Sequence, residues 1–441
     1  MIEKYLVKKI TEPVDWKITV PGSKSMTNRA LLMAVLSAGT VRVEGVLFSD
    51  DSRHFLACLV ALGFTVEIEE EKKCVTVTGC GGRIPRGEAV IDVGSAGTAA
   101  RFLAAMLGFS DGCYEIRCSA QMKRRPMAEL FDLLSGAGAK ITFLEEEGHL
   151  PVRITGCRYA RADKTAGETP RELSLDITKS TQFLSALLLI APMVPEGMKI
   201  HITSEKTDGS YIRITRKMMQ EFGVSVAFDG RDYEVPCRSS YRKETYMVEP
   251  DMSAACYFYA AAAVTGGRAL VRHVHMDNTQ GDLRFLEVLE HMGCTADDTP
   301  EGILVTGPAD GALRVITVNM NDFSDQALTL AAIAPFADAP VRIEGIGHIR
   351  GQECDRIHAI QTNLTALGIR CEEEETAATI YPGSPHGGSV ETYDDHRVAM
   401  AFSLVGLRTD GIVIENPACC RKTFENYFTV LSELTGKTVE G

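Results

Sequence analysis

Runs of apolar residues recur along the chain with the spacing of helices, and polar residues and glycines separate them. Segments 30–36 and 183–191 are almost wholly apolar, which is typical of helices that are buried on every side. A short run with alternating apolar residues, such as Val41-Arg-Val43, follows each of these helices and predicts a strand. A second helical pattern then ends at a glycine, the residue that favours a left-handed helix end. The pattern therefore predicts a repeated unit of strands and helices.

This unit is repeated six times along the sequence. The first helices are predicted to open near Ser25, Ser95, Ser180, Ser253, Asp325 and Asp395. The second helices are predicted to end at Gly63, Gly138, Gly223, Gly293, Gly368 and Gly436. This spacing is too long for a thin solenoid repeat and fits a βαβαββ module. We therefore expect six such modules in one chain.

The alternation of strand and helix patterns places the fold in the α/β (α+β) class. Six modules indicate two lobes of three, and breaks at Pro21-Gly22 and Glu249-Pro250 are the predicted chain crossings. One lobe would then be discontinuous, with residues 1–20 and 250–441, and the other would hold residues 21–249. Each buried first helix begins with polar residues, and helix N-termini attract anions. We expect these N-termini to face a cleft between the lobes and to bind anions there.

Composition and charge narrow the possible partners. The chain has 441 residues, of which 45% are hydrophobic and 24% charged, as in ordinary globular proteins. Its net charge of −13 disfavours nucleic acid as a partner. The longest apolar run, 183–194, is too short to cross a bilayer, and residues 1–9 do not resemble a signal peptide. The sequence thus predicts a cytoplasmic protein with no membrane partner.

The thirteen cysteines form no C-x-x-C pair, and the histidines show no metal-binding spacing. The sequence therefore predicts neither a disulfide framework nor a metal site.

The stretch Pro21-Gly-Ser-Lys-Ser25 is the first candidate for binding chemistry. It opens an apolar helix much as a phosphate-binding loop does, but it lacks the upstream glycine of the nucleotide-binding motif. Lys24 and Ser25 are therefore candidates for binding an anion other than a nucleotide. Arg29 follows Ser25 by one helical turn and joins them on the same face.

The second and third modules add candidates of two kinds. Gly97, in a Gly-Ser-Ala-Gly turn, allows a ligand to approach the backbone closely, and Arg125 follows two other cations. Ser180, Thr181 and Gln182 offer neutral donors for phosphate oxygens or hydroxyl groups, although Ser180 would equally serve as a helix cap. In the fourth module, Glu249, Asp251 and Ser253 are interpreted as structural capping residues.

The last two modules are the richest in charged residues. Their candidates are Asp325, His348, Gln352, Glu353, Arg356, Arg397 and Lys422. A carboxylate directly before a buried helix is commonly a helix cap, so a structural role for Asp325 stays open. Glu353 and Asp355 would likewise suit a first helical turn.

Taken together, these motifs resemble those of the 5-enolpyruvylshikimate-3-phosphate (EPSP) synthase family of enolpyruvyl transferases. The motifs are Pro21-Gly-Ser-Lys-Ser25 with Asn28-Arg29, Ser49-Asp-Asp51, Ala96-Gly-Thr98, Met122-Lys-Arg-Arg-Pro126, Ser180-Thr-Gln182, Asp325, Glu353-Cys-Asp-Arg356, Asp395-His-Arg397 and Lys422-Thr-Phe424. The resemblance implies a two-lobe fold of six modules, in agreement with the repeats. It also implies transfer of the enolpyruvyl group of phosphoenolpyruvate to the 5-hydroxyl of shikimate 3-phosphate. The reaction would pass through a tetrahedral intermediate, without a cofactor, in a protein expected to be a monomer.

The resemblance also implies which residues contact each substrate. Phosphoenolpyruvate would be surrounded by Lys24, Gly97, Arg125, Gln182, Arg356, Arg397 and Lys422. Shikimate 3-phosphate would be surrounded by Lys24, Ser25, Arg29, Ser180, Thr181, Gln182, Tyr211, Asp325, His348 and Gln352. Arginine suits a ligand with a carboxylate and a phosphate because its planar fork matches both groups. The candidate base is Asp325, and the candidate acid is Glu353 or Lys24.

Some positions depart from the family pattern. Gln352 stands where lysine is common and adds no charge, so binding of shikimate 3-phosphate would be weaker. His348 stands where asparagine is common, which is a milder change. Ser95 and Phe102 differ beside the Ala-Gly-Thr turn, which predicts altered sensitivity to the herbicide glyphosate. Either Ser204 or Ser210 would supply a substrate serine. Two alternative functions stay open: a transferase acting on UDP-N-acetylglucosamine, and a non-catalytic ligand-binding relic of the fold.

Overall fold

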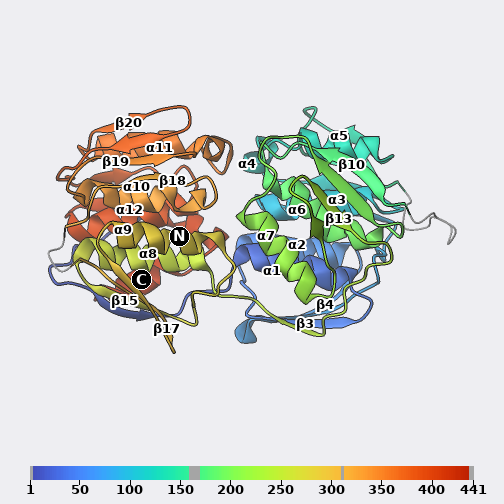
Figure 1. The fold of residues 1–441 in the computed structure, drawn as a ribbon, viewed down its shortest axis with the longest axis horizontal. Helices are drawn as coiled ribbons and strands as arrows, with labels where there is room; N and C mark the ends of the chain where they lie inside the picture. The colour runs from blue at the N-terminus through green and yellow to red at the C-terminus, as the bar shows by residue number, and fades with distance from the viewer. Residues whose placement is uncertain (1–2, 158–168, 309–311, 437–441) are drawn as a thin grey trace. The chain divides into compact units, whose positions relative to one another are not determined.

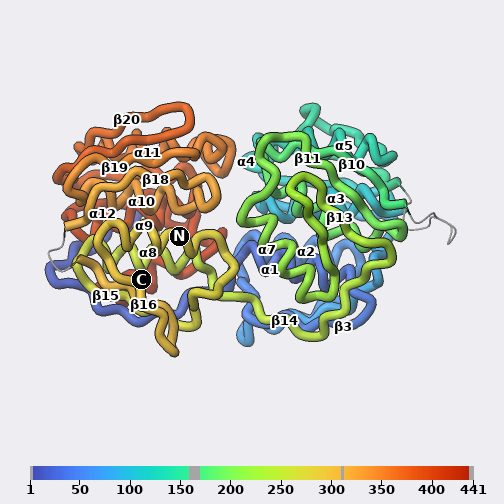
Figure 2. The backbone as a smooth tube through the Cα atoms, viewed as in Figure 1, coloured from blue at the N-terminus to red at the C-terminus, as the bar shows by residue number. Residues whose placement is uncertain are grey.

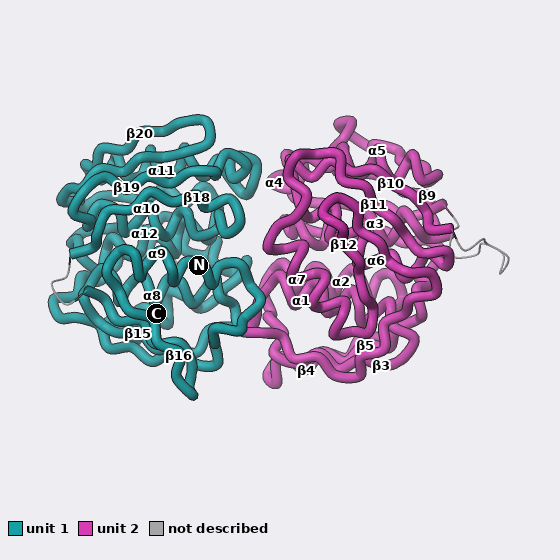
Figure 3. Tube along the Cα trace, in the orientation of Figure 1, with its two compact units in different colours: residues 1–21, 250–441 teal, residues 22–249 magenta. Residues whose placement is uncertain are grey.

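The computed structural model describes residues 3–157, 169–308 and 312–436. The chain divides into two compact units (Figure 3): unit 1 comprises Met1–Pro21 and Pro250–Gly441, and unit 2 comprises Gly22–Glu249. The chain therefore passes from one unit to the other after Pro21 and again after Glu249. Within the described residues, no helix is both long and apolar enough for a bilayer crossing.

Unit 2 contains three modules, each built from four strands and two principal helices (Figure 1). The first consists of β14 (Thr245–Met247), α1 (Lys24–Leu36), β3 (Thr40–Glu44), α2 (Asp50–Ala61), β4 (Thr65–Glu69) and β5 (Cys74–Thr78). The second consists of β6 (Glu88–Asp92), α3 (Gly97–Gly108), β7 (Cys113–Arg117), the short α4 (Ala120–Lys123), α5 (Ala128–Gly136), β8 (Lys140–Phe143) and β9 (Val152–Thr155). The third consists of β10 (Arg171–Leu175), α6 (Thr181–Ile190), β11 (Met198–Ile202), α7 (Ser210–Glu221), β12 (Ala227–Phe228) and β13 (Asp232–Val235).

Unit 1 repeats the same plan with one smaller sheet. Its first module consists of β2 (Asp15–Ile18), α8 (Met252–Thr265), β15 (Arg268–Arg272), α9 (Phe285–His291), β16 (Thr295–Thr299) and β17 (Gly302–Thr306). The next consists of β18 (Thr317–Asn319), α10 (Ala327–Ile333), β19 (Val341–Glu344), α11 (Arg356–Ala366), β20 (Cys371–Glu373) and β21 (Ala378–Ile380). The last consists of β22 (Gly388–Val390), α12 (His396–Arg408), β23 (Ile412–Glu415), α13 (Tyr427–Leu434) and the N-terminal β1 (Lys4–Leu6).

The strands of the five four-stranded modules pair in the same way. In the second module of unit 2 the order is β6-β7-β9-β8, with β6 parallel to β7 and the other pairs antiparallel. The first helix is thus the crossover between two parallel strands, and the last two strands form a hairpin. In the three-stranded sheet, β1 pairs antiparallel with β23 and takes the place of a hairpin strand. The prediction of repeated βαβαββ modules is confirmed.

Two strands belong to a different unit from the helix that follows them in sequence. β2 precedes α1 but pairs in parallel with β15 of unit 1. Conversely, β14 precedes α8 but pairs in parallel with β3 of unit 2, beside which it lies in Figure 2. Each crossing between the units therefore follows a strand that is anchored by backbone hydrogen bonds. The first crossing lies between β2 and α1, and the second lies between β14 and α8.

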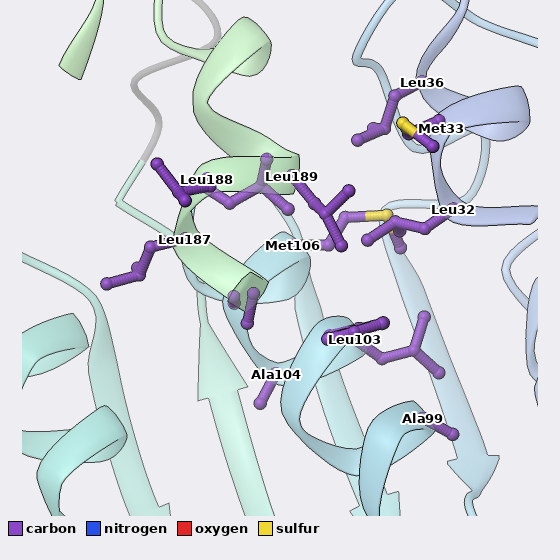
Figure 4. Close-up of a cluster of buried hydrophobic side chains, with 14 of the residues drawn as sticks. Leu32, Met33, Leu36, Ala99, Leu103, Ala104, Met106, Leu187, Leu188 and Leu189 are labelled. Atoms are coloured by element: carbon purple, nitrogen blue, oxygen red, sulfur yellow. The ribbon is translucent and has the colours of Figure 1, made fainter. Parts of the chain in front are cut away.

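The first helix of each module lies in a hydrophobic core. Every residue of α8 except Thr265 is buried, and α3 is buried along its whole length. In unit 2, Leu32 of α1, Leu103 of α3 and Leu189 of α6 belong to one cluster of buried side chains (Figure 4). Unit 1 has a core of its own. The prediction of buried first helices is confirmed.

The second helices stop where the glycines predict. Two residues after each of them lies a glycine with a φ angle between 62° and 100°, namely Gly63, Gly138, Gly223, Gly293, Gly368 and Gly436. These left-handed conformations are strained for other residues. The glycines therefore end the helices and turn the chain into the following strand.

Candidate active site

Charged and polar side chains gather in two clusters, one in each unit. The unit 1 cluster comprises Ser253, Asp282, Asp325, Gln352, Glu353, Arg356, Asp395, Arg397 and Lys422. In unit 2 there are the ion pair Lys24–Asp51 and a group formed by Gly97, Arg101, Arg125 and Gln182, and we call these two sets together the unit 2 cluster. We describe each cluster within its own unit.

Arg356 is the centre of the unit 1 cluster. It is the first residue of α11, its side chain is 1% exposed, and it contacts three carboxylates. Its Nε lies 2.8 Å from Asp395 Oδ2, its Nη1 2.9 Å from Asp325 Oδ1, and its Nη2 3.0 Å from Glu353 Oε2. Burial opposes the charged form, but these carboxylates outweigh it and raise the pKa of Arg356. Arg356 is therefore a fixed cation.

Arg397 is a second cation directed at the same carboxylate. Its Nη2 lies 2.9 Å from Asp325 Oδ2, so the two oxygens of Asp325 are shared between Arg356 and Arg397. Arg397 belongs to the first turn of α12, which Asp395 caps by accepting a hydrogen bond from the Arg397 backbone N–H. The helix cap thus places the guanidinium beside Asp325.

The sequence left open whether Asp325 caps a helix. In the structure it is not the residue that caps α10. It lies in the middle of a 3-10 turn, Ser324–Gln326, just before α10. Its side chain is 13% exposed and is held by two guanidinium groups. These ion pairs stabilise the carboxylate form, which is the form that a proton acceptor requires.

Glu353 is held in a similar way by a lysine. Lys422, at the end of the 3-10 turn Pro417–Lys422, places its Nζ 3.3 Å from Glu353 Oε1, while Arg356 contacts the other oxygen. Both side chains are less than 10% exposed. Glu353 precedes α11, which is capped by Asp355 through a hydrogen bond from the His358 backbone N–H. Asp355 is therefore the helix cap, and the Glu353 carboxylate contacts Arg356 and Lys422 instead.

The fourth module contributes more than the capping that its sequence indicates. Asp251 caps α8 as expected, accepting from the backbone N–H groups of Ser253 and Ala254. The hydroxyl of Ser253, however, donates to the buried carboxyl of Asp282 and accepts a hydrogen bond of 3.4 Å from Arg397. Ser253 therefore also links Asp282 to Arg397, in addition to its place at the start of the helix.

His348 and Gln352 lie at the edge of this cluster, in and after the 3-10 turn Gly347–Gly351. His348 is exposed, and its Nε2 lies 2.8 Å from Ser324 Oγ. Gln352 accepts a hydrogen bond from Arg356 through its amide oxygen. His348 therefore contacts the residue next to Asp325 in the sequence, and Gln352 contacts the arginine that pairs with Asp325.

In unit 2, Lys24 is the first residue of α1 and pairs with a buried carboxylate. Its Nζ lies 3.3 Å from Asp51 Oδ2, and the two side chains are 14% and 3% exposed. Asp51 is in the first turn of α2, whose start is fixed by a capping box between Ser49 and Ser52. Two helix N-termini therefore meet at this ion pair.

Two arginines approach the backbone of Gly97, the first residue of α3. A Cβ atom at this position would lie 2.5 Å from Arg125 Nη1 and 2.7 Å from Arg101 Nη1. Only glycine leaves room for both guanidinium groups here. Arg125 and Arg101 are 8% and 3% exposed. Two like charges beside a helix N-terminus form a strongly positive point, which suits an anionic ligand.

The third module supplies the neutral donors next to these arginines. Gln182 accepts a 3.1 Å hydrogen bond from Arg101 Nη1, and Ser180 caps α6 through the Gln182 backbone N–H. Gly209, just before α7, has Thr181 as its neighbour, because a Cβ on Gly209 would lie 3.5 Å from Thr181 Cγ2. The starts of α6 and α7 therefore lie together. Ser210 is the first residue of α7.

Ser204, the other candidate substrate serine, holds its own loop. Its hydroxyl donates to the Lys206 carbonyl and accepts from the Ile177 backbone N–H, and the residue is 5% exposed. Ser204 therefore braces the segment before α7.

Arg29 lies deeper than the other candidates. It is fully buried, and its guanidinium donates to Thr215, to Ser185 and to the carbonyls of Ser25 and Tyr211. Burial lowers the pKa of Arg29 to about 10. The Tyr211 ring lies 5.7 Å from this guanidinium. Arg29 thus ties α1 to α6 and α7, and Ser25 and Tyr211 are positioned through it.

Five residues of the clusters were missed as candidates by sequence reasoning: Asp51, Arg101, Ser253, Asp282 and Asp395. Arg101 had a visible signal, because it is the one charged residue within the buried helix α3. Asp51 was noted only within a motif. Among the residues that the structure describes, no group of three or more His, Cys, Asp or Glu side chains is arranged to hold a metal ion.

The architecture is that of the enolpyruvyl transferases. The enolpyruvyl transferase NikO from Streptomyces tendae has the same fold, with a TM-score of 0.72 at 17% identity over 98% of this chain and 97% of that one. The EPSP synthase of Acinetobacter baumannii is more similar, with a TM-score of 0.79 at 25% identity over 99% of this chain and 98% of that one.

Sequence comparison identifies the particular family. Residues 8–431 match the family model of EPSP synthase (3-phosphoshikimate 1-carboxyvinyltransferase). The 3-phosphoshikimate 1-carboxyvinyltransferase of Trichormus variabilis is 40% identical over 429 residues, covering 97% of this chain and 98% of its own. The chain belongs to the EPSP synthase family, and the resemblance seen in its motifs is confirmed.

Proposed function

We propose that the two clusters together carry out the reaction of the EPSP synthase family, with phosphoenolpyruvate and shikimate 3-phosphate as substrates. In that reaction the enolpyruvyl group is transferred to the 5-hydroxyl of shikimate 3-phosphate and phosphate is released. The chain is accordingly a transferase of the shikimate pathway, which supplies chorismate and the aromatic amino acids. We place it in the cytoplasm, as a monomer.

The observation that carries the assignment of the residues is the pairing of each of two carboxylates with two cations. Asp325 is shared by Arg356 and Arg397, and Glu353 by Arg356 and Lys422. Such a cluster has the cations that an anionic substrate requires and the carboxylates that proton transfer requires. Arg356, Arg397 and Lys422 would bind the carboxylate and phosphate of phosphoenolpyruvate.

In unit 2, Lys24, Gly97, Arg125 and Gln182 would bind phosphoenolpyruvate as well. Shikimate 3-phosphate would be bound by Lys24, Ser25, Arg29, Ser180, Thr181, Gln182, Tyr211, Asp325, His348 and Gln352. Ser180, Thr181 and Gln182 offer uncharged donors at the start of α6, where the helix dipole favours a phosphate. Arg29 would act mainly by holding Ser25 and Tyr211 in place.

The chemistry requires one base and one acid. Asp325 would accept the proton of the 5-hydroxyl as this oxygen attacks C2 of phosphoenolpyruvate, and Glu353 or Lys24 would protonate C3. Loss of a proton from C3 and departure of phosphate from C2 then complete the transfer. Neighbouring cations favour the carboxylate form of Glu353. An anion bound to Arg356 and Lys422 would weaken that effect, so substrate binding itself would favour the acid form of Glu353.

Phosphate release provides the test. The protein should release phosphate from phosphoenolpyruvate with shikimate 3-phosphate and not with UDP-N-acetylglucosamine. Arg125→Lys in unit 2 and Arg397→Lys in unit 1 should each raise the KM for phosphoenolpyruvate roughly tenfold or more, because lysine cannot make a bidentate contact. An effect from only one of the two variants would contradict the joint action of the clusters. Release with neither acceptor would favour a non-catalytic relic of the fold.

A further inference from the structure

The buried carboxyl of Asp282 lies behind Arg397 and is connected to it by one hydroxyl group. Asp282 is 7% exposed and lies in the 3-10 turn Gly281–Arg284. Ser253 donates its hydroxyl proton to Asp282 Oδ2, and the same hydroxyl oxygen accepts from Arg397 Nη2 at 3.4 Å. Arg397 Nη2 also contacts Asp325 Oδ2 at 2.9 Å. A continuous path therefore leads from Asp282 through Ser253 and Arg397 to Asp325.

This path is held rigidly by the start of α8. Gln280 accepts from the Met252 backbone N–H through its amide oxygen and donates to the Pro250 carbonyl at 2.7 Å. The Cys256 thiol donates to the Asp282 carbonyl. The turn that carries Asp282 is thus fixed to α8, and Ser253 in the first turn of α8 is fixed by the Asp251 cap. Ser253 has little freedom to leave Arg397.

The charges around Asp282 explain why its own charge matters. Asp325 and Asp251 face it as like charges, whereas Arg397 and the Ser253 hydroxyl favour its ionised form. Burial is the largest effect, and together with Asp325 it raises the pKa of Asp282 to about 7. Asp282 therefore changes its charge in the neutral range, directly behind a cation assigned to phosphoenolpyruvate.

We propose that Asp282 is a positioning residue that controls the affinity of Arg397 for phosphoenolpyruvate through the Ser253 hydroxyl. The proposal rests on the assignment of Arg397 to this substrate. Ser253 fixes the guanidinium, and the charge of Asp282 determines how far that guanidinium is neutralised before the substrate arrives. An ionised Asp282 weakens binding of the anion, and a protonated Asp282 leaves Arg397 fully available.

Two substitutions separate the two parts of this role. Asp282→Asn keeps an oxygen that can accept from Ser253 but removes the charge. Ser253→Ala keeps the charge but removes the bridge. Asp277→Asn, on an exposed residue of the same loop, is the matched control. The KM for each substrate and kcat are measured from pH 6 to 8.5, and thermal unfolding of each variant is recorded.

We expect the ratio of the wild-type KM for phosphoenolpyruvate to that of Asp282→Asn to rise from about one at pH 6 to roughly threefold or more at pH 8. Ionisation of the substrate phosphate cancels in this ratio. Ser253→Ala should raise this KM several-fold across the range, with kcat changed less than twofold. The KM for shikimate 3-phosphate should follow the control in both variants.

The possible results distinguish the positioning role of Asp282 from the assignment of Arg397 to phosphoenolpyruvate. If Arg397→Lys raises the KM for phosphoenolpyruvate but both variants match Asp277→Asn at every pH, the positioning role is wrong and the assignment of Arg397 stands. If Asp282→Asn and Ser253→Ala change the unfolding temperature but not the KM for phosphoenolpyruvate, the two residues have a structural role only, and the proposal is overturned. If Arg397→Lys has no effect, the assignment itself fails. Should Asp282→Asn not fold, the KM of Ser253→Ala decides.

Discussion

Arg356 and Asp395 form an ion pair that is closed to solvent. The Arg356 Nε lies 2.8 Å from Asp395 Oδ2, and the two side chains are 1% and 0% exposed. Asp395 also caps α12, so one carboxylate joins the start of α11 to the start of α12. The orientation of the guanidinium toward Asp325 and Glu353 thus depends on a carboxylate that solvent does not reach.

Replacing Asp395 by asparagine should therefore destabilise the fold. The amide keeps the cap but leaves the buried Arg356 with one fewer counter-charge, and breaking such a pair costs roughly 3–5 kcal/mol. Urea unfolding should show this loss in the free energy of unfolding. Asp394→Asn, at the adjacent exposed residue, is the control and should stay within about 0.5 kcal/mol of the wild type. Equal stability of the two variants would contradict a structural role for the pair.

The role of Asp325 as base predicts a loss of turnover without a loss of fold. Asp325→Ala should lower kcat by roughly 100-fold or more, since a positioned base contributes on that scale. Circular dichroism should remain native. Asp322→Asn is the matched control, because Asp322 lies one turn away and faces Arg284. A kcat for Asp325→Ala close to that of the control would remove Asp325 from the role of base.

Gly97→Ala should weaken phosphoenolpyruvate binding while the protein stays folded. The added methyl group would meet the ends of the Arg125 and Arg101 side chains, at 2.5 and 2.7 Å, and these flexible groups would have to move away. The KM for phosphoenolpyruvate should rise roughly tenfold, as for loss of one charge-assisted contact. Gly136→Ala, in a helix with open space around the new methyl, is the control. Its KM should equal that of the wild type.

Much of the fold could be predicted because its signals are local. Glycines such as Gly63 and Gly138 mark helix ends through their own backbone conformation, and the buried helices are visible as apolar runs. The exchange of β2 and β14 between units had no such signal. Both are short strands, and their partners β15 and β3 lie more than two hundred residues away in the sequence.

Only part of the candidate site could be predicted, because some of its residues have a local signal in the sequence and others do not. Arg356, Arg397 and Lys422 stand out at helix starts or turns, and the motifs of the family contain them. Ser253 looks like one more residue in a helix start, and Asp282 like one more carboxylate in a turn. Their importance comes from Arg397, which is more than a hundred residues away in the sequence. In the folded protein Arg397 contacts Ser253, and Ser253 in turn contacts Asp282.

Asp282 should also make stability depend on pH. The pKa of Asp282 is about 7 in the folded protein, against an ordinary value of 3.8. At a pH between these two values the folded state holds a proton that the unfolded state has lost. The contribution of Asp282 is therefore favourable at low pH and disappears as the pH rises through 7. Asp282→Asn, which does not titrate, should gain stability relative to the wild type between pH 5 and pH 8. Chemical unfolding at both pH values measures this gain, and a constant difference would contradict it.

Lys206 offers a cation near the start of α6. A Cβ on Gly209 would lie within 4.0 Å of both Lys206 Nζ and Thr181 Cγ2, so the ammonium group and Thr181 border the same point. A phosphate held by Thr181 would be stabilised by this charge. We expect Lys206→Met to raise the KM for shikimate 3-phosphate roughly threefold to tenfold at low salt, and less at high salt, because salt screens a partly exposed charge.

The matched control for Lys206 is Lys217→Met, which removes an exposed lysine from the body of α7. This variant has the same change in net charge, so any effect of the overall field on an anionic substrate appears in both. The KM for phosphoenolpyruvate should be equal in the two variants, because the arginines beside Gly97 are untouched. If the two variants also share one KM for shikimate 3-phosphate at low salt, Lys206 has no specific contact with that substrate. The neutral donors of α6 would then bind its phosphate with the helix dipole alone.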